Sequence, residues 1–394
     1  MFAHLYEWLA LAIRWLHVIA GIAWIGDSFY FMWLDASLQR DESTPEGVKG
    51  ESWSVHGGGF YRVIKFQNAP DAMPEKLHWF MWQSYTTWLS GVALLAVVYW
   101  LQAKAFMLGG SIESAGAAVG TGVATVFGGF LVYHLLCKSP LGKKPVVLAG
   151  ILLAFAAGVA YALGQVLSPR AAYIHVGAMI GTWMAGNVAM VIIPNQRKIV
   201  AALMDGKEPD PALGAESKLR STHNNYLTLP VIFVMISNHY PSTFGHEHAW
   251  LVLIGLFAIG AFTRVFFNMK NAGRFIGWML PAAGIAYVVL AIVTAPKPLP
   301  EVEGGDSVTW AQVEPIITTH CVSCHSATPT HHIFKTAPNG VTYDTPQEVA
   351  SKAAMIKARA VDTATMPLAN ETNMTAEERA TLGAWISAGA PIPQ

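Results

Sequence analysis

The residues best suited to chemistry lie close together toward the carboxyl end of the chain. Residues 321–325 read Cys-Val-Ser-Cys-His. In this C-x-x-C-H spacing, Cys321 and Cys324 are placed to form thioether bonds to a porphyrin, and His325 follows at once to ligate its iron. The alternatives for a Cys-x-x-Cys pair are a redox dithiol or half of a zinc site. A site of four cysteines is excluded because the chain has three, so the motif predicts a covalently bound haem c.

A haem iron of this kind needs a sixth ligand, and methionine in that position raises the reduction potential and suits electron transfer. Met366 lies in the irregular run Thr-Met-Pro-Leu, which favours it as this ligand. Met355 falls in an Ala-rich helical stretch, where a core methionine is expected. Met374 directly precedes Thr375, a predicted N-cap whose capping box is completed by Glu378.

The composition changes before this motif. A Pro-rich linker at residues 296–300 is followed by a polar stretch, 301–394, which predicts a small cytochrome c domain. Its final helix is predicted from Ala376 to about Ser387. The side chains expected on the haem core are Leu382, Trp385 and Ile386, and those expected on the surface are His320, His331 and His332.

The part of the chain that precedes the linker must position any further chemistry, and its composition indicates a membrane. Of the 394 residues, 53% are hydrophobic and only 13% are charged, against about 25% charged in soluble domains. The balanced net charge of zero argues against nucleic acid as a partner. We therefore expect residues 1–295 to form an integral membrane domain.

The apolar runs predict an all-α fold with eight transmembrane spans, followed by the small c-type cytochrome domain. The spans are predicted at 9–38, 78–101, 118–137, 146–167, 171–193, 222–240, 248–268 and 275–295. Lysine and arginine concentrate in one set of alternate loops, and the other short loops hold only Lys104 and Arg170. By the positive-inside rule, both termini and the cytochrome domain lie on the outer side.

Histidines within the predicted spans are the next candidates, because ionisable groups in a membrane are costly. We place His17, His175 and His239 in the outer half, and His78, His134 and His223 near the inner face. Spans one and five share a Leu/Ile-His-Val start and a Gly-Asp/Asn end, which predicts a parallel 4+4 repeat. In that repeat His17 faces His175, a pair able to hold a haem b, and His78 faces His223; bonding within the bundle is the alternative.

Two other features of this half are candidates. Asp27 lies deep in the first span, where a carboxylate is expensive unless it is paired, protonated or used in acid–base chemistry. The predicted inner loop 39–77 contains a run of glycines followed by Arg62, Lys65, Gln67 and Asn68. Glycines let a backbone approach a ligand, and these polar groups suit a planar anionic heterocycle. An ordinary basic inner loop is the alternative.

The run Trp-Leu-His-Val-Ile-Ala-Gly-Ile-Ala-Trp-Ile-Gly-Asp, the Gly-rich loop and the terminal Cys-Val-Ser-Cys-His together resemble the membrane-anchored, cytochrome-c-linked urate hydroxylases of bacteria. The resemblance covers the whole chain. It implies oxidation of urate to 5-hydroxyisourate in the bacterial inner membrane, with electrons passing to the fused cytochrome c and on to a respiratory acceptor, a cytochrome c or a terminal oxidase. The first span alone also resembles the haem-b-binding protoporphyrinogen oxidases of bacteria.

The position of the substrate stays open at this point. An inner site would use His78, His223, Arg62 and Gln67, with Asp27 as a further catalytic candidate and His17 and His175 relaying electrons. An outer site would make His17, Asp27 and His175 catalytic. The alternative function is a non-catalytic electron-transfer subunit that passes electrons from quinol to a partner oxidase. A transporter with a redox sensor is a third possibility.

Overall fold

The computed structural model describes residues 2–67, 69–70, 73–295, 298–302, 308–331 and 334–393. The protein is mostly helical. Up to Val293 the helices are α1 (Phe2–Ser37), α2 (Trp82–Leu95), α3 (Ala103–Phe106), α4 (Ala115–Lys138), α5 (Pro145–Val166), α6 (Pro169–Asn187), α7 (Ile193–Met204), α8 (Pro211–Ser237), α9 (Pro241–Phe244), α10 (Ala249–Asn271) and α11 (Met279–Val293), with π-helical turns η1 (Ala96–Trp100) after α2 and η3 (Val188–Ile192) between α6 and α7, and a 3-10 turn η2 (Pro140–Lys143).

A helix lies on each range predicted as a span. In the described part of the chain, five helices are long and apolar enough to cross a membrane: α1, α4, α5, the continuous helix from α6 to α7, and α10. The helix α11 is apolar but shorter. The helix α2 begins at Trp82, so His78 precedes it in an irregular segment. This half is thus mostly helical, and the departure from the predicted all-α fold is a short hairpin.

The helix α6 is the centre of the bundle, and small residues explain how its neighbours approach it. Most of its residues are buried, whereas α1 is largely exposed on the bundle's edge. A Cβ placed on Gly177 would lie 2.3 Å from Val234 of α8, and one on Gly122 of α4 would lie 2.5 Å from His175. Glycine at such contacts lets helix backbones pack closely.

The Gly-rich segment forms a hairpin, which differs from the loop we predicted. Strands β1 (Val48–His56) and β2 (Gly59–Phe66) pair antiparallel, with Trp53 opposite Arg62. Gly57 and Gly58 join them with φ values of +58° and +80°. Two consecutive positive φ values characterise the tight hairpin turn, which glycine adopts without steric cost. These glycines therefore shape the turn itself.

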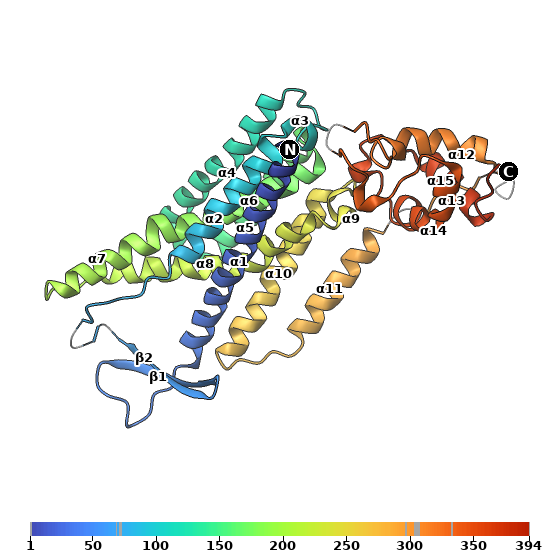
Figure 1. Cartoon of the computed structure of the whole chain (residues 1–394). Helices are drawn as coiled ribbons and strands as arrows, with labels where there is room; N and C mark the ends of the chain where they lie inside the picture. The colour runs from blue at the N-terminus through green and yellow to red at the C-terminus, as the bar shows by residue number, and fades with distance from the viewer. Residues whose placement is uncertain are drawn as a thin grey trace.

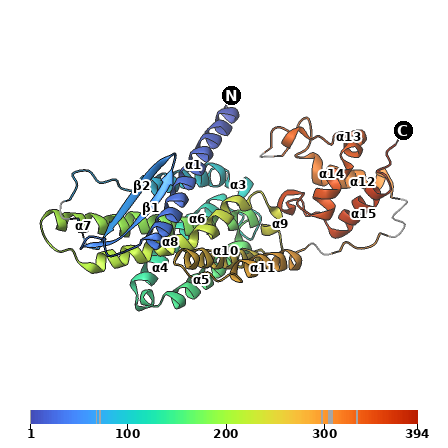
Figure 2. The ribbon, with the colours of Figure 1, turned by 90° about the horizontal axis from the view of Figure 1, so that it is seen from below.

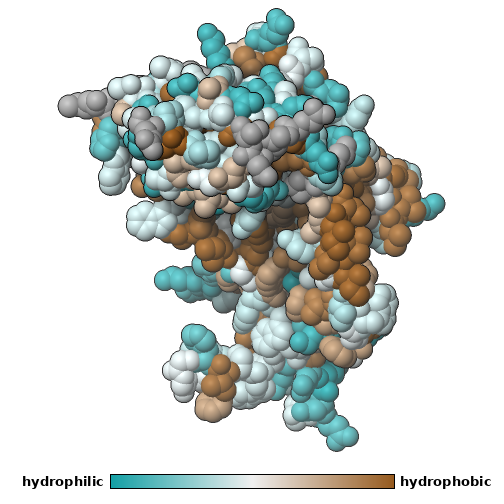
Figure 3. Space-filling view, turned by 90° about the vertical axis from the view of Figure 1, so that its right-hand side faces the viewer, coloured by the Kyte–Doolittle hydropathy of each residue, from teal (hydrophilic) through white to brown (hydrophobic). Residues whose placement is uncertain are grey.

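Figures 1 and 2 show how the two ends of the bundle differ. The N-terminus and α9 lie toward the C-terminal part, and the hairpin and α7 lie at the opposite end. The C-terminal part touches the bundle where η8 (Leu368–Asn370) contacts α9. In Figure 3 hydrophobic side chains gather on the helices below and behind the more polar C-terminal part.

The C-terminal part has a hydrophobic cluster of its own. Its elements are α12 (Trp310–Ile317), η5 (Thr318–Val322), η6 (Pro338–Gly340), α13 (Pro346–Ser351), α14 (Ala353–Ile356), η7 (Lys357–Asp362), η8 and α15 (Ala376–Ser387). The predicted final helix is confirmed as α15, and its Thr375–Glu378 capping box is formed. Leu382 and Trp385 are fully buried in the cluster.

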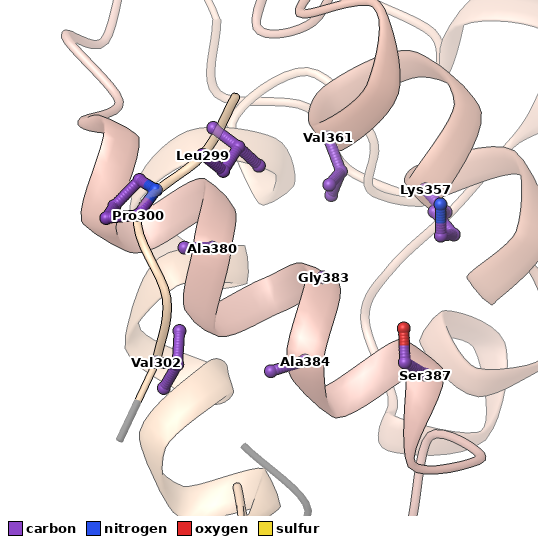
Figure 4. A pocket seen from close by; sticks show the side chains of 9 residues that line it. All are labelled: Leu299, Pro300, Val302, Lys357, Val361, Ala380, Gly383, Ala384 and Ser387. Atoms are coloured by element: carbon purple, nitrogen blue, oxygen red, sulfur yellow. The ribbon is translucent and has the colours of Figure 1, made fainter. Parts of the chain in front are cut away.

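A cavity of about 270 Å³ lies between residues 299–302, η7 and α15. Figure 4 shows the side chains that line it. Its lining is mostly apolar, with Lys357 and Ser387 among it. Leu299 and Val302 also pack against the cluster of the C-terminal part. The end of the predicted linker is therefore held against this part; Pro296 and Lys297 lie outside the described residues.

Candidate functional site

The Cys-Val-Ser-Cys-His segment lies at the end of the α12–η5 helix, where the chain turns tightly. The amides of Cys324 and His325 both donate to the carbonyl of Cys321, at 3.2 and 2.9 Å. All three cysteines of the chain are free thiols. Burial raises the pKa of the Cys321 thiol to about 12, and burial also raises the pKa of Cys324.

The orientation of His325 is set by its other ring nitrogen. Nδ1 donates to the carbonyl of Val341 at 3.0 Å, and the ring lies 5.2 Å from that of Tyr343, centre to centre. Such a bond fixes the tautomer and leaves Nε2 with its lone pair available. A histidine held in this way fits the role of an axial haem ligand.

The methionines of this part are placed differently from one another. Met366 is 38% exposed, and its carbonyl accepts from Arg379 Nη1 at 2.6 Å. Met374 is buried in the hydrophobic cluster. Met355 is 47% exposed, so our expectation that it is a core residue is wrong. Met366 as the sixth ligand stays a prediction.

Neither of the two described histidines that we predicted on the surface is exposed. His320 is 7% exposed; its Nδ1 lies 2.7 Å from Thr372 Oγ1 and its Nε2 lies 3.2 Å from Glu378 Oε1. The π-helical turn η5 directs this side chain inward. His331 lies 3.5 Å from Glu371, and His332 lies outside the described residues.

The outer histidines have different neighbours in the bundle. His17 Nδ1 donates to the carbonyl of Thr87 at 2.9 Å. His175 is completely buried; its Nδ1 donates to Ala171 O at 2.8 Å and its Nε2 accepts from Trp100 Nε1 at 3.1 Å. In this arrangement neither ring nitrogen of His175 is available to iron. The predicted haem b does not fit this conformation of His175, and we derive no step through it.

Four of the five predicted catalytic residues are not brought together by any hydrogen bond or ion pair in the described part of the chain. Arg62 pairs with Glu51 on the exposed hairpin, with Nε 2.7 Å from Oε2. Gln67 is exposed beyond β2, and His78 is exposed and contacts Phe80. Asp27 Oδ2 is buried without a hydrogen-bond partner.

The fifth residue, His223, belongs to a buried network between α4, α6 and α8. Its Nδ1 lies 2.9 Å from the hydroxyl of Tyr133, which accepts from Asn187 Nδ2 at 2.8 Å. The same Nδ2 donates to Asn224 Oδ1 at 2.8 Å, and Arg220 Nη1 donates to Asn187 Oδ1 at 3.3 Å. Arg220, Asn187 and Tyr133 are essentially inaccessible.

A second network lies on the neighbouring side of α8 and uses Arg264 of α10. Its Nε and Nη2 donate to Asn225 Oδ1 at 3.3 and 3.1 Å, and Nη2 also donates to Asn268 Oδ1 at 2.9 Å. The guanidinium lies 4.2 Å from the ring centre of Phe29 on α1. Adjacent residues of α8, Asn224 and Asn225, thus belong to two different networks, and Asn225 accepts directly from Arg264 whereas Asn224 bonds Asn187.

The sequence analysis did not identify Arg220 and Arg264 as site residues. Both lie beside predicted inner loops, where basic residues are expected from the positive-inside rule alone. The available signal was the run Arg-Ser-Thr-His-Asn-Asn at 220–225. Polar residues in this density at the start of a predicted apolar span are expensive in a membrane unless neighbouring helices satisfy them. Only the packed bundle shows that they point inward.

Comparison with protein families gives one match. The model of the urate oxidase N-terminal family matches residues 3–295, and the chain belongs to this family. Neither the curated proteins nor the solved structures contain a match. Membership indicates an oxidoreductase concerned with urate-related oxidation.

Proposed function

We propose that this member of the urate oxidase N-terminal family oxidises urate to 5-hydroxyisourate in its helical bundle and passes the electrons to a c-type haem carried by its own C-terminal part. The proposal rests on the presence, in one chain, of a urate oxidase family domain and a C-x-x-C-H segment. The family match ends at residue 295, and the Cys321–His325 segment follows with His325 Nδ1 already bonded to a backbone carbonyl.

The residues of this segment fit a covalent haem. Cys321 and Cys324 are free thiols one helical turn apart, and His325 keeps Nε2 for the iron. Met366 is the proposed sixth ligand. When bound, the haem supplies a centre that accepts one electron at a time. The apolar cluster of the C-terminal part, with Leu382 and Trp385, would exclude water from the porphyrin.

We further propose that all eight helices on the predicted ranges cross the bacterial inner membrane, with both termini in the periplasm. Five of them meet the length and hydropathy expected of a span. The common placement of the N-terminus and the C-terminal part, opposite the hairpin and α7, supports this topology (Figure 1). It also places the haem segment in the compartment where c-type haem is attached.

The overall reaction balances with water as the source of oxygen. The urate monoanion and one water yield neutral 5-hydroxyisourate, one proton and two electrons, so each urate reduces two ferric haems. The electrons leave for a downstream respiratory acceptor, a cytochrome c or a terminal oxidase. The bundle must therefore bind the purine, hold it against water and release protons.

The test is an anaerobic titration of the purified, oxidised holoprotein with urate, followed through its visible spectrum. We expect the c-type bands to become reduced, with one urate consumed for every two haems and 5-hydroxyisourate as product. If dithionite reduces the haem but urate does not, the proposal fails. Reduction by quinol in place of urate would then indicate the electron-transfer subunit.

A further inference from the structure

Two arginines are buried in the bundle without a counter-charge. Arg220 is 1% exposed and Arg264 is 5% exposed. Among the described residues, no carboxylate lies within ion-pair distance of either guanidinium. Their burial also distinguishes them from arginines that extend to a lipid headgroup. A buried cation is costly unless its donors are satisfied or an anion joins it.

Arg264 is well supported by neighbouring side chains. Three hydrogen bonds to Asn225 and Asn268 use its Nε and both hydrogens of Nη2, and the ring of Phe29 lies beneath the guanidinium. Its surroundings are those of a structural arginine that ties α10 to α8 and α1.

Arg220 is not satisfied in this way. Its guanidinium makes one hydrogen bond, a 3.3 Å contact from Nη1 to Asn187 Oδ1, and lies 5.5 Å from the ring centre of Tyr133. A guanidinium carries five N–H donors. The other groups that its donors face are the Tyr133 hydroxyl and the Cys137 thiol, so the described groups around this guanidinium supply no anion.

The groups around Tyr133 offer further donors. Trp183 stacks on the Tyr133 ring at 5.0 Å, and its buried Nε1 has no hydrogen-bond partner among the described residues. The Tyr133 hydroxyl accepts from Asn187, so its own proton points to Nδ1 of His223. In that tautomer the Nε2 of a neutral His223 carries a proton and donates. Hydrogen-bond donors of Arg220, Trp183 and His223 therefore lie around Tyr133.

We propose that Arg220, with Trp183 and His223, forms the binding site for the anionic purine on which the proposed function rests. Urate near neutral pH is a planar monoanion rimmed by carbonyl oxygens and N–H groups. Its oxygens match the donors of Arg220, Trp183 and His223. Arg264, equally buried in the next network, is the structural counterpart.

The first experiment compares R220Q and R220K with R264Q in the full-length holoprotein. Urate binding is measured anaerobically by equilibrium dialysis after complete reduction of the haem, so that no acceptor remains and no turnover occurs. A charged hydrogen bond contributes about 1.5–3 kcal/mol, so we expect R220Q to raise the Kd about 10- to 100-fold. R220K should recover part of this loss, and R264Q should bind like the wild type but unfold at a lower temperature.

A second measurement needs no variant. With haem attached through Cys321 and Cys324, Cys137 is the remaining thiol, and its Sγ lies 3.9 Å from His223 Nδ1. Urate should slow the alkylation of Cys137 by a small maleimide, with a midpoint equal to its Kd.

The outcomes separate the two proposals. The Arg220 site is overturned if R220Q binds urate as tightly as the wild type, or if urate does not protect Cys137. The proposed urate function still stands in that case, provided that urate reduces the haem of the wild type. A wild type that neither binds urate nor is reduced by it overturns both.

Discussion

The helical bundle and the C-terminal part organise polar chemistry in opposite ways. In the C-terminal part the reactive groups are neighbours in sequence, and one helical turn presents Cys321, Cys324 and His325 together. In the bundle, Tyr133, Asn187 and His223 come from three helices and meet only through packing. A motif of contiguous residues can therefore be recognised from the sequence alone. A site inside a bundle can be recognised only when the packing of every helix around it is known.

The largest expected effect concerns the local motif. Replacing both Cys321 and Cys324 with alanine removes the two thioether anchors. We expect complete loss of covalent haem, seen as loss of the haem stain after denaturing electrophoresis. The bundle should still bind urate because its network shares no residue with the motif. Replacing Cys137 with alanine is the control. Loss of haem in C137A as well would contradict the assignment of the haem to the local motif.

Met366 tests whether the C-terminal site extends beyond contiguous residues. If Met366 is the sixth ligand, M366H should lower the reduction potential by on the order of 100 mV, since axial ligands tune haem potentials over a wide range. Potentiometric titration measures this shift. The exposed Met355 supplies the control, M355H, and a shift in that variant with none in M366H would reassign the ligand.

Helix packing in the bundle is tested at two glycines of α6. In G177A the new Cβ meets Val234 Cγ1 at 2.3 Å, whereas in G181A its nearest neighbour is Val231 Cγ2 at 3.9 Å. Overpacking a tight contact costs about 1–3 kcal/mol, so G177A should unfold at a lower temperature in detergent. G181A should equal or exceed the wild type because alanine favours the helix. Equal behaviour of the two variants would show that α6 and α8 do not pack as described.

The smallest effect concerns the cap of α15. Hydrogen bonding by the Thr375 amide, aided by His320, lowers the pKa of Glu378. The folded carboxyl thus binds a proton less readily than the unfolded one, so its stabilisation is present above its ordinary pKa and is lost as pH falls through the folded value. We expect E378Q to lower the melting temperature of the haem's Soret ellipticity by about 1–3 °C at pH 7, and the difference to close below about pH 4. E377Q, on the same turn, is the control, and a gap that persists in acid would contradict the cap.

Much of the secondary structure followed from the sequence. Apolar runs near the length of a bilayer predicted helices on all eight ranges, and the Thr375–Glu378 spacing predicted the start of α15. The hairpin was missed because its alternation is obscured by aromatic residues on both strands. His320 was misplaced because a π-helical turn shifts the helical register by which exposure is inferred.

The sequence by itself predicted the haem segment, because the chemistry of covalent attachment requires contiguous residues whatever fold surrounds them. It also determined the apolar character of residues 1–295. The tertiary structure alone decided which polar side chains of the bundle meet, since hydrogen bonds between Asn187, Arg220 and His223 depend on how α6 and α8 face one another. For the same reason it alone separated Arg264, which makes three hydrogen bonds to asparagine side chains, from Arg220, which makes one. Sequence records the type of each charged residue, but only packing determines which of its donors still lack an acceptor.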